Sequence, residues 1–509
     1  MRSLFNYSLG PIPWSLANTD GTPSKTDKSK LLHLIEGDTV PADSVPSQAI
    51  WLVDGMALLQ SFPAIPRGST FADLAFSIFN QVASPFKSGC PRVDFVTDQY
   101  PSVSIKNCER ARRSQGGVLR VILQPQQPVP RQWKKYLSCG SNKVELAAFL
   151  CQEWQNPRYA PALRGKMMIT TAVEDCYCLS SIDGQSITRS AVDGLTGCTH
   201  EEADTRLLLH AHHAAHTTTQ HRPAIVIKSP DTDVAILSCA LASQLPSSEI
   251  FFRTGTKQRT RFIPLHSVAA KLGADVCSAL VGLHAFTGCD STSCFVGKGK
   301  KAAFSLMSTP RFRSAMAELG KEWQPTDLLH YECEALTCAL YGVPGVPINE
   351  ARYKLFCAKS PQCYQLPPTK DALEKHVQRA CYQAAIWRRA LMCKPEVPSP
   401  HNHGWCLHDG ELHIDWMSQL PAPREILELV SCRCKSEQSC STGRCSCMRN
   451  GLPCTDCCGC IDCANPNKSA SGKYISALSL TNKCNCVWYF FTDLSRKPLF
   501  QEISNSNPY

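Results

Sequence analysis

Four short apolar runs in this 509-residue sequence each end at aspartate. The residues at these ends are Asp54, Asp98, the pair Asp231 and Asp233, and Asp290. Carboxylates brought close together raise one another's pKa values, and such a cluster persists only where cations neutralise it. Oxygen ligands of this kind suit hard ions such as Mg²⁺ or Mn²⁺, which keep positions open for substrate phosphate. If the fold gathers these ends, the pattern predicts a divalent-metal site.

A helix-like segment, "EEADTRLLLHAHHAAH", adds further acids in its first turn, Glu201, Glu202 and Asp204. Acids are common there because the helix dipole stabilises negative charge, so this motif alone fits a structural role as well as a ligand role. The sequence Asp231-Thr-Asp233 is equally ambiguous, because it also forms turns. The order and spacing of all the segments favour the metal site.

Alternating elements are expected to position these acids. Apolar runs that read as strands alternate with helical segments such as 141–154 and 201–216, which predicts an α/β fold with a mostly parallel sheet flanked by helices. In such a sheet, functional groups gather at the carboxyl ends of the strands. The divisions expected along the chain are an N-terminal extension (1–45), the core (46–310), a helical region (311–428), a cysteine-rich module (430–466) and a tail (467–509).

The composition of the chain limits the classes of partner that we expect it to bind. Hydrophobic residues make up 43% of the chain and the formal net charge is +10, which suits a soluble protein with a polyanionic partner. No uninterrupted apolar stretch reaches the length of a membrane span, so no membrane is expected. Eight Lys or Arg residues and one acid fall between 104 and 135, directly after Asp98. They indicate either a phosphate-binding segment or a solvated basic face.

A glycine-lysine cluster follows Asp290. It comprises Gly297, Lys298, Gly299, Lys300 and Lys301. Glycines let backbone N–H groups approach phosphate closely, and a helix beginning there adds favourable dipole charge. By itself the cluster also fits a turn followed by a solvated basic helix.

Ten of the 30 cysteines lie between Cys432 and Cys463 at tight spacings. Thiolates so close in sequence are typical of tetrahedral zinc sites, whereas disulfides are the alternative for a secreted chain. We expect zinc and a reducing compartment.

The acidic segments are similar to the motifs of the flap endonuclease family, within the PIN-like nucleases. "WLVDGMALLQSF", "DFVTDQYPSVSIKNCERARR", "EEADTRLLLHA", "KSPDTDVAIL" and "TGCDSTSCFVGKGKKAAF" occur in the family's order over about 46–310. The family uses seven carboxylates, whose counterparts here are Asp54, Asp98, Glu202, Asp204, Asp231, Asp233 and Asp290. Glu201 is an alternative to Glu202.

This resemblance implies a two-metal phosphodiester hydrolysis. It implies that Lys106 and Arg112 contact the scissile phosphate, that residues 297–301 hold a duplex phosphate, and that the insert 114–198 is the counterpart of the family's helical arch or cap. DNA is a more natural partner than RNA, although PIN-like folds serve both.

The cysteine-rich module resembles the CXC domain of the tesmin/TSO1 family, a nuclear DNA-binding module with three zinc ions. Its nine matching cysteines are Cys432, Cys434, Cys440, Cys445, Cys447, Cys454, Cys458, Cys460 and Cys463, with Cys457 spare. The residues that would contact phosphates are Arg433, Lys435, Arg444 and Arg449. The spacing around Cys440 is about one residue longer than in the family.

Together these features predict a nuclear, metal-dependent, structure-selective nuclease with a zinc-binding DNA-binding module. The combination also fits a protein derived from a mobile element. The alternative is a catalytically inactive nuclease-like scaffold on DNA or chromatin.

Overall fold

The computed structural model describes residues 2–62, 68–101, 103–106, 123–217, 223–245, 248–255, 259–359, 361–408, 410–427, 431–435, 440–442, 444–449, 454, 458–460 and 465. Arg112 and Cys463, two of the predicted site residues, lie outside these ranges.

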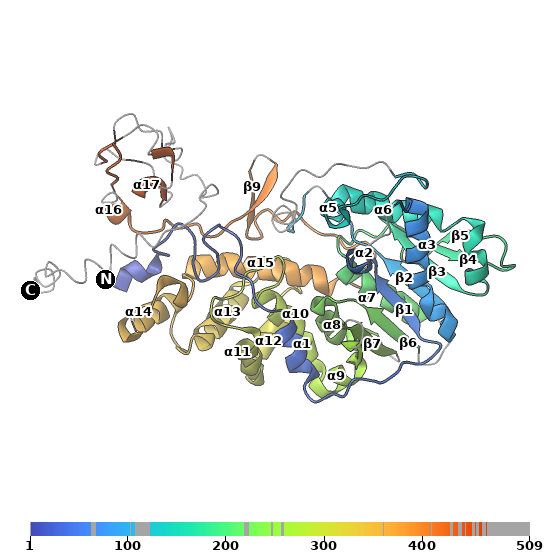
Figure 1. Cartoon of the computed structure of the whole chain (residues 1–509). Coiled ribbons are helices and arrows are strands. Elements are labelled where there is room, and N and C mark those ends of the chain that lie inside the picture. The colour runs from blue at the N-terminus through green and yellow to red at the C-terminus, as the bar shows by residue number, and fades with distance from the viewer. Residues whose placement is uncertain are drawn as a thin grey trace, which may run out of the picture.

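An eight-stranded sheet organises the chain (Figure 1). Its strands are β1 (Ile50–Asp54), β2 (Arg92–Val96), β3 (Met167–Ala172), β4 (Asp175–Ser180), β5 (Thr188–Ala191), β6 (Ala224–Lys228), β7 (Glu249–Thr254) and β8 (Arg261–Pro264). The order is β5-β4-β3-β2-β1-β6-β7-β8. The five central strands are parallel, and β4, β5 and β8 add antiparallel edges. The predicted α/β class with a mostly parallel sheet is confirmed.

Helices cover both faces of the sheet, as parallel strands require. Neighbouring residues of β1 pack into two different cores on opposite faces of the sheet: Val53 lies in the first core and Leu52 in the second. The first core contains α2 (Gly55–Ser61), α3 (Phe71–Val82), α5 (Trp133–Leu137) and α6 (Gly140–Glu153). The second contains α7 (Ala203–Thr217), α8 (Thr232–Ala240), α9 (Leu265–Leu272) and α10 (Ala274–Phe286).

The predicted helical region extends the second core. After α11 (Lys300–Ser305), which falls in the range predicted for the core, the region contains α12 (Pro310–Glu318), α13 (Asp327–Leu340), α14 (Ile348–Lys359) and α15 (Lys370–Arg388). The hairpin β9 (Trp405–His408) and β10 (Glu411–Ile414) follows. Leu336, Val377 and Trp387 from these helices share one buried cluster with α10. Farther along lie the short helices α16 (Arg424–Leu427) and α17 (Ser446–Arg449).

Residues 2–45 pack on the rest of the chain. The helix α1 (Ser29–Glu36) buries Leu31 and Ile35 in the second core, and Ala42 forms an antiparallel bridge with Phe262. Phe5 packs beside α14. The segment expected to be an extension therefore contributes to the core of the protein.

Two expected elements differ in the structure. The run before Asp290, expected as a strand, is the helix α10; it is buried nearly all round, and a short apolar run without periodicity does not distinguish helix from strand. The described part of the insert 114–198 is no purely helical arch, because β3, β4 and β5 lie within it and widen the sheet.

Among the described residues, no single helix has the length and apolar character to cross a membrane. The consecutive pair α9 and α10 meets both criteria only when joined, and the two helices are bent by 105° at their junction.

Candidate metal and phosphate site

The sheet creates a crevice at the carboxyl end of β1. The strand β2 pairs with one edge of β1, and β6, which comes later in the chain, pairs with the other edge. The strand order therefore reverses at β1. Ligands of open α/β sheets bind at such a switch point. Asp54 ends β1, Asp98 follows β2, and Asp231 and Asp233 follow β6.

Three carboxylates converge there. Asp204, in the first turn of α7, has an oxygen within 4.8 Å of oxygens of Asp231 and Asp233, all three within that distance of one another. Asp231 caps α8 and accepts a hydrogen bond from the backbone N–H of Asp233 (2.9 Å). We call these three residues the acidic triad. Its geometry suits a divalent cation.

Asp54 and Asp98 flank the triad and are held by neighbouring groups. Asp54 caps α2 through the backbone N–H of Ala57 (2.9 Å) and accepts from the Ser229 hydroxyl (2.9 Å). Asp98 accepts from the backbone N–H of Ala203 (2.7 Å). Burial, reinforced by the carboxylate of Asp98, raises the pKa of Asp54 to about 7. Both side chains are thus oriented before any ligand binds.

Two lysines tie the remaining acids to the triad. The Lys28 ammonium lies 2.8 Å from Asp233, 3.0 Å from Asp290 and 3.4 Å from Asp231. Lys106 pairs with Glu202 and lies 3.8 Å from Asp290. The two ammonium groups thus contact four of the seven predicted carboxylates, Asp231, Asp233, Asp290 and Glu202. A cation can therefore still find negative charge at this site.

The positions of Glu201 and Glu202 differ. Glu201 accepts a hydrogen bond from Ser104, whereas Glu202 pairs with Lys106. Burial raises the pKa of Glu202 to about 7 against the opposing charge of Lys106. Glu202 is therefore the acid that joins the charged cluster.

Lys28 was not among the predicted site residues. Its segment runs along the loop that contains Asp290: the N–H of Cys294 donates to the Ser24 carbonyl (2.9 Å), and the Lys25 ammonium donates to the Asp290 carbonyl (2.6 Å). These contacts hold Lys28 over the triad. In the sequence it is one lysine in a Ser, Thr, Pro and Lys stretch, which carries no signal for this role.

The pKa values distinguish members of the triad. Burial raises the pKa of Asp204 well above its usual range, with a further rise from the carboxylate of Asp231. Burial and Asp233 raise the pKa of Asp231. The pKa of Asp233 is lowered instead, because His284 and Lys28 outweigh the effect of its burial. The triad thus contains two carboxylates whose charge lacks full compensation.

Asp233 is oriented by a buried relay. The Lys300 ammonium lies 3.0 Å from Nδ1 of His284, so that nitrogen accepts and Nε2 donates to Asp233 (2.9 Å). Burial, helped by Lys300, lowers the pKa of His284 to about 4, which keeps the ring neutral. The relay fixes one oxygen of Asp233 and leaves the other toward Lys28.

Lys300 was predicted to bind DNA, and this prediction is wrong. Its side chain is fully buried, where it donates to the Thr287 hydroxyl (2.9 Å) as well as to His284. Lys301 and both Gly297 and Gly299 are exposed, and Lys298 lies over the ring of Tyr341. Gly297 has a φ of +73°, a conformation that favours glycine. Accessible backbone and lysines therefore remain in this cluster.

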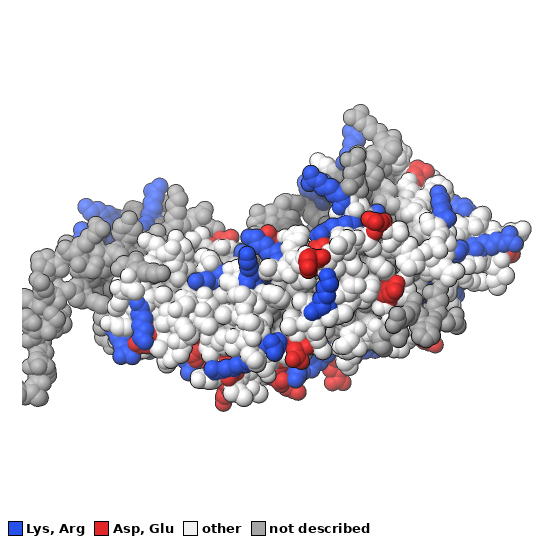
Figure 2. Space-filling model, turned by 90° about the horizontal axis from the view of Figure 1, so that it is seen from below, with Lys and Arg blue, Asp and Glu red and all other residues white. Residues whose placement is uncertain are grey.

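Charges of both signs are interspersed on the face shown in Figure 2. Acidic and basic side chains of the described residues alternate there over a largely uncharged surface. The formal charge of +10 belongs to the whole chain, including the basic stretch 104–135, half of which lies outside the described residues.

The cysteine-rich module brings thiols together in two overlapping groups of four. Cys432, Cys440, Cys445 and Cys454 form one, and Cys432, Cys447, Cys454 and Cys458 form the other. Cys434 and Cys460 pack beside them. None of the described cysteines forms a disulfide. Two cysteines shared between groups would bridge metal ions, and Arg433, Lys435 and Arg444 are exposed on this module, with Arg449 half-buried.

Comparison with protein-family models and with curated proteins finds no match to this chain.

Proposed function

We propose that the protein is a metal-dependent nuclease that hydrolyses phosphodiester bonds at the acidic triad. The observation that carries this proposal is the convergence of Asp204, Asp231 and Asp233 at the switch point of the sheet. Uncompensated, buried carboxylates cost stability, and a cation-binding role explains why the fold keeps them.

The residues have distinct tasks in this proposal. Asp204, Asp231 and Asp233 would hold Mg²⁺ or Mn²⁺, with Asp54, Asp98, Glu202 and Asp290 around them. Bound divalent ions supply an activated water and stabilise the leaving oxygen. His284 and Lys300 orient Asp233 through a chain of hydrogen bonds. Lys106, between Glu202 and Asp290, is placed to donate to a phosphate oxygen.

The cysteine-rich module supports the choice of nucleic acid as substrate. We propose that it binds about three Zn²⁺ ions and that Arg433, Lys435, Arg444 and Arg449 contact DNA phosphates. A nuclease core joined to such a module fits a nuclear protein derived from a mobile element. DNA is the proposed substrate, and structure-selective cleavage is the proposed mode.

One observation favours the non-catalytic alternative. Lys28 already places a positive charge among the acids, at 2.8 Å from Asp233. If no divalent ion displaced that ammonium, the site would be a neutralised remnant and the protein a DNA-binding scaffold.

Cleavage assays separate the two functions. Labelled flap, duplex and single-stranded DNA and RNA would be incubated with Mg²⁺ or Mn²⁺ and the full-length protein or its Asp231→Asn variant. Asp275→Asn, which removes an 85% exposed carboxylate, is the matched control. Metal-dependent cleavage lost only in Asp231→Asn supports the nuclease. Binding without cleavage supports the scaffold, and equal cleavage by all three proteins indicates contamination.

A further inference from the structure

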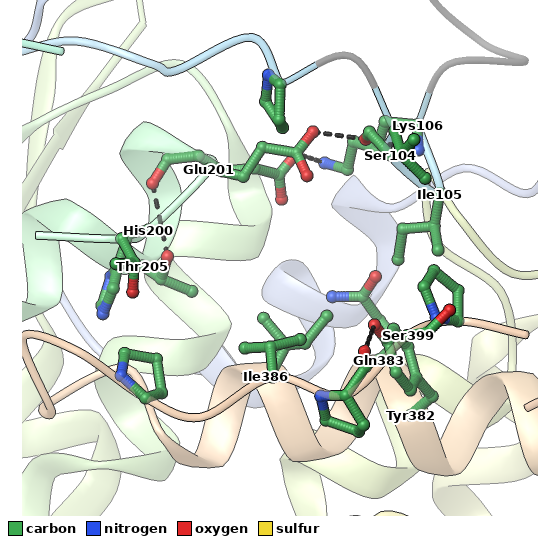
Figure 3. Close-up of a pocket in the computed structure, with 18 residues that line it drawn as sticks. Ser104, Ile105, Lys106, His200, Glu201, Thr205, Tyr382, Gln383, Ile386 and Ser399 are labelled. Atoms are coloured by element: carbon green, nitrogen blue, oxygen red, sulfur yellow. Dashed lines mark hydrogen bonds and ion pairs between the residues drawn. The ribbon is translucent and has the colours of Figure 1, made fainter. Parts of the chain in front are cut away.

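A cavity of about 410 Å³ opens beside the acidic site (Figure 3). Its walls come from residues 101–106, residues 199–205 at the start of α7, one face of α15 and the loop 395–400. Small-molecule sites in proteins span about 300–1,000 Å³, so this volume suits one compact ligand group.

The walls are mostly apolar. Ile386, Pro398 and the ring of Tyr382 line the cavity, and the Tyr382 hydroxyl donates to the Pro398 carbonyl (2.7 Å), which fastens the loop to α15. Flat apolar walls of this kind favour a planar group that presents faces rather than charges.

One buried amide faces this apolar space. Gln383 is 2% exposed, and its Oε1 accepts a hydrogen bond from the Ser291 hydroxyl. That bond fixes the amide, and its nitrogen points into the cavity in Figure 3. A fixed N–H donor inside an apolar cavity favours a ligand with a carbonyl oxygen or ring nitrogen at its edge.

The cavity and the acidic site share two residues. Lys106 and Glu202 line the cavity and pair with each other, and Lys106 also lies 3.8 Å from Asp290. A group in the cavity would therefore lie next to whatever phosphate occupies the acidic site.

We propose that the cavity receives one unpaired nucleobase of the strand whose phosphate lies at the acidic site, with the Gln383 amide donating to the base edge. This inference rests on the proposed function, because it assumes a nucleic-acid substrate there. A base has apolar faces and polar edges, which match these walls and this amide. A base held in a duplex cannot enter, so the cavity selects strands with an unpaired nucleotide at that position.

The test uses the full-length protein and the Ile386→Trp variant, which fills the cavity. Leu407→Trp, at a 41% exposed position on β9, is the matched control. Single-stranded DNA carrying 2-aminopurine at successive positions would report where a base leaves its stack. We expect one position to change fluorescence on binding, and Ile386→Trp to remove that change and weaken single-strand affinity about tenfold, since stacking one base contributes about 1–3 kcal/mol.

Affinity for a fully paired duplex should stay the same in all three proteins. Thermal unfolding shows whether the Ile386→Trp variant is folded. If that variant is unfolded, Val397→Trp, which fills the cavity from the opposite loop, takes its place in the test. Gln383→Met, which keeps the shape and removes the donor, should reduce differences between bases at the responding position.

The outcomes separate this proposal from the nuclease itself. A position-specific signal that Ile386→Trp removes, with no cleavage of any substrate, supports the cavity and overturns the nuclease. Cleavage with no responding position, or with equal responses in Ile386→Trp and Leu407→Trp, overturns the cavity and supports the nuclease. Weaker binding of fully paired duplex DNA by the Ile386→Trp variant also overturns the proposal that the cavity receives a base.

Discussion

Two groups of acids on the same sheet have opposite surroundings. Asp94, in the middle of β2, is fully buried between Arg92, whose guanidinium donates to both its oxygens (2.8 and 2.7 Å), and His210 (2.7 Å). Although burial opposes it, Arg92 lowers the pKa of Asp94 to about 2. At the end of the sheet, burial and neighbouring carboxylates raise the pKa of Asp204.

The difference lies in charge compensation rather than in burial. Asp94 has matched partners and stabilises the fold, whereas the triad has too few cations and stays responsive to an added one. Perturbed pKa values mark both places, but only an upward shift caused by crowded carboxylates indicates a cation site.

The largest expected effect is at Asp94. Asp94→Asn removes the charge that compensates buried Arg92, and we expect the free energy of unfolding to fall by about 3–5 kcal/mol. Asp204→Asn removes crowding and should raise the stability of the metal-free protein. Urea denaturation measures both, and a destabilised Asp204→Asn variant would contradict the contrast drawn here.

Divalent metal should stabilise the protein through the triad alone. At 100 times the dissociation constant, Mn²⁺ or Mg²⁺ should add about 2.7 kcal/mol to the free energy of unfolding. Thermal unfolding with and without metal tests this, after the cysteine-rich module has been saturated with zinc. Asp231→Asn should lose the shift and Asp275→Asn should keep it, while equal shifts in both would place the metal elsewhere.

Metal affinity should rise with pH. Asp54 and Glu202, with pKa values of about 7, are largely protonated at pH 6 and attract a cation fully only after they ionise. Affinity measured by calorimetry should therefore increase from pH 6 to pH 8, by at most about tenfold for each proton released, or about 1.4 kcal/mol. The metal-free protein should lose stability over the same range, because the folded form of these raised carboxyls prefers the proton. A metal affinity that does not change with pH would contradict this prediction.

The smallest expected effect is at Lys28. Lys28→Met removes the ammonium that competes for the triad, so metal should bind several-fold more tightly, while the metal-free protein loses about 1 kcal/mol of stability. Lys30→Met, two residues along in α1 and exposed, is the control. Weaker metal binding in Lys28→Met would show that the ammonium assists the metal.

Sequence patterns located the acids at the ends of β1, β2 and β6, because a short apolar run that ends at an aspartate is recognisable in the sequence. Asp290 lies in the site although its run folds as α10; the loop after the helix, not a strand, delivers it. The burial of Lys300 could not be predicted from the sequence, because it depends on hydrogen bonds to His284 and Thr287 that form only in the folded protein. Lys28 meets Asp233 across 205 residues, and no local pattern encodes that contact.

The docking of residues 15–28 has a consequence for biosynthesis. This segment is synthesised well before its hydrogen-bond partners, Cys294 and Val296. At about 5–20 residues per second, roughly 15 to 60 s separate the two. During that interval Lys28 is already present, but the loop that holds it over the triad has not been made, so the acids that precede residue 290 lack its fixed positive charge until Cys294 and Val296 emerge.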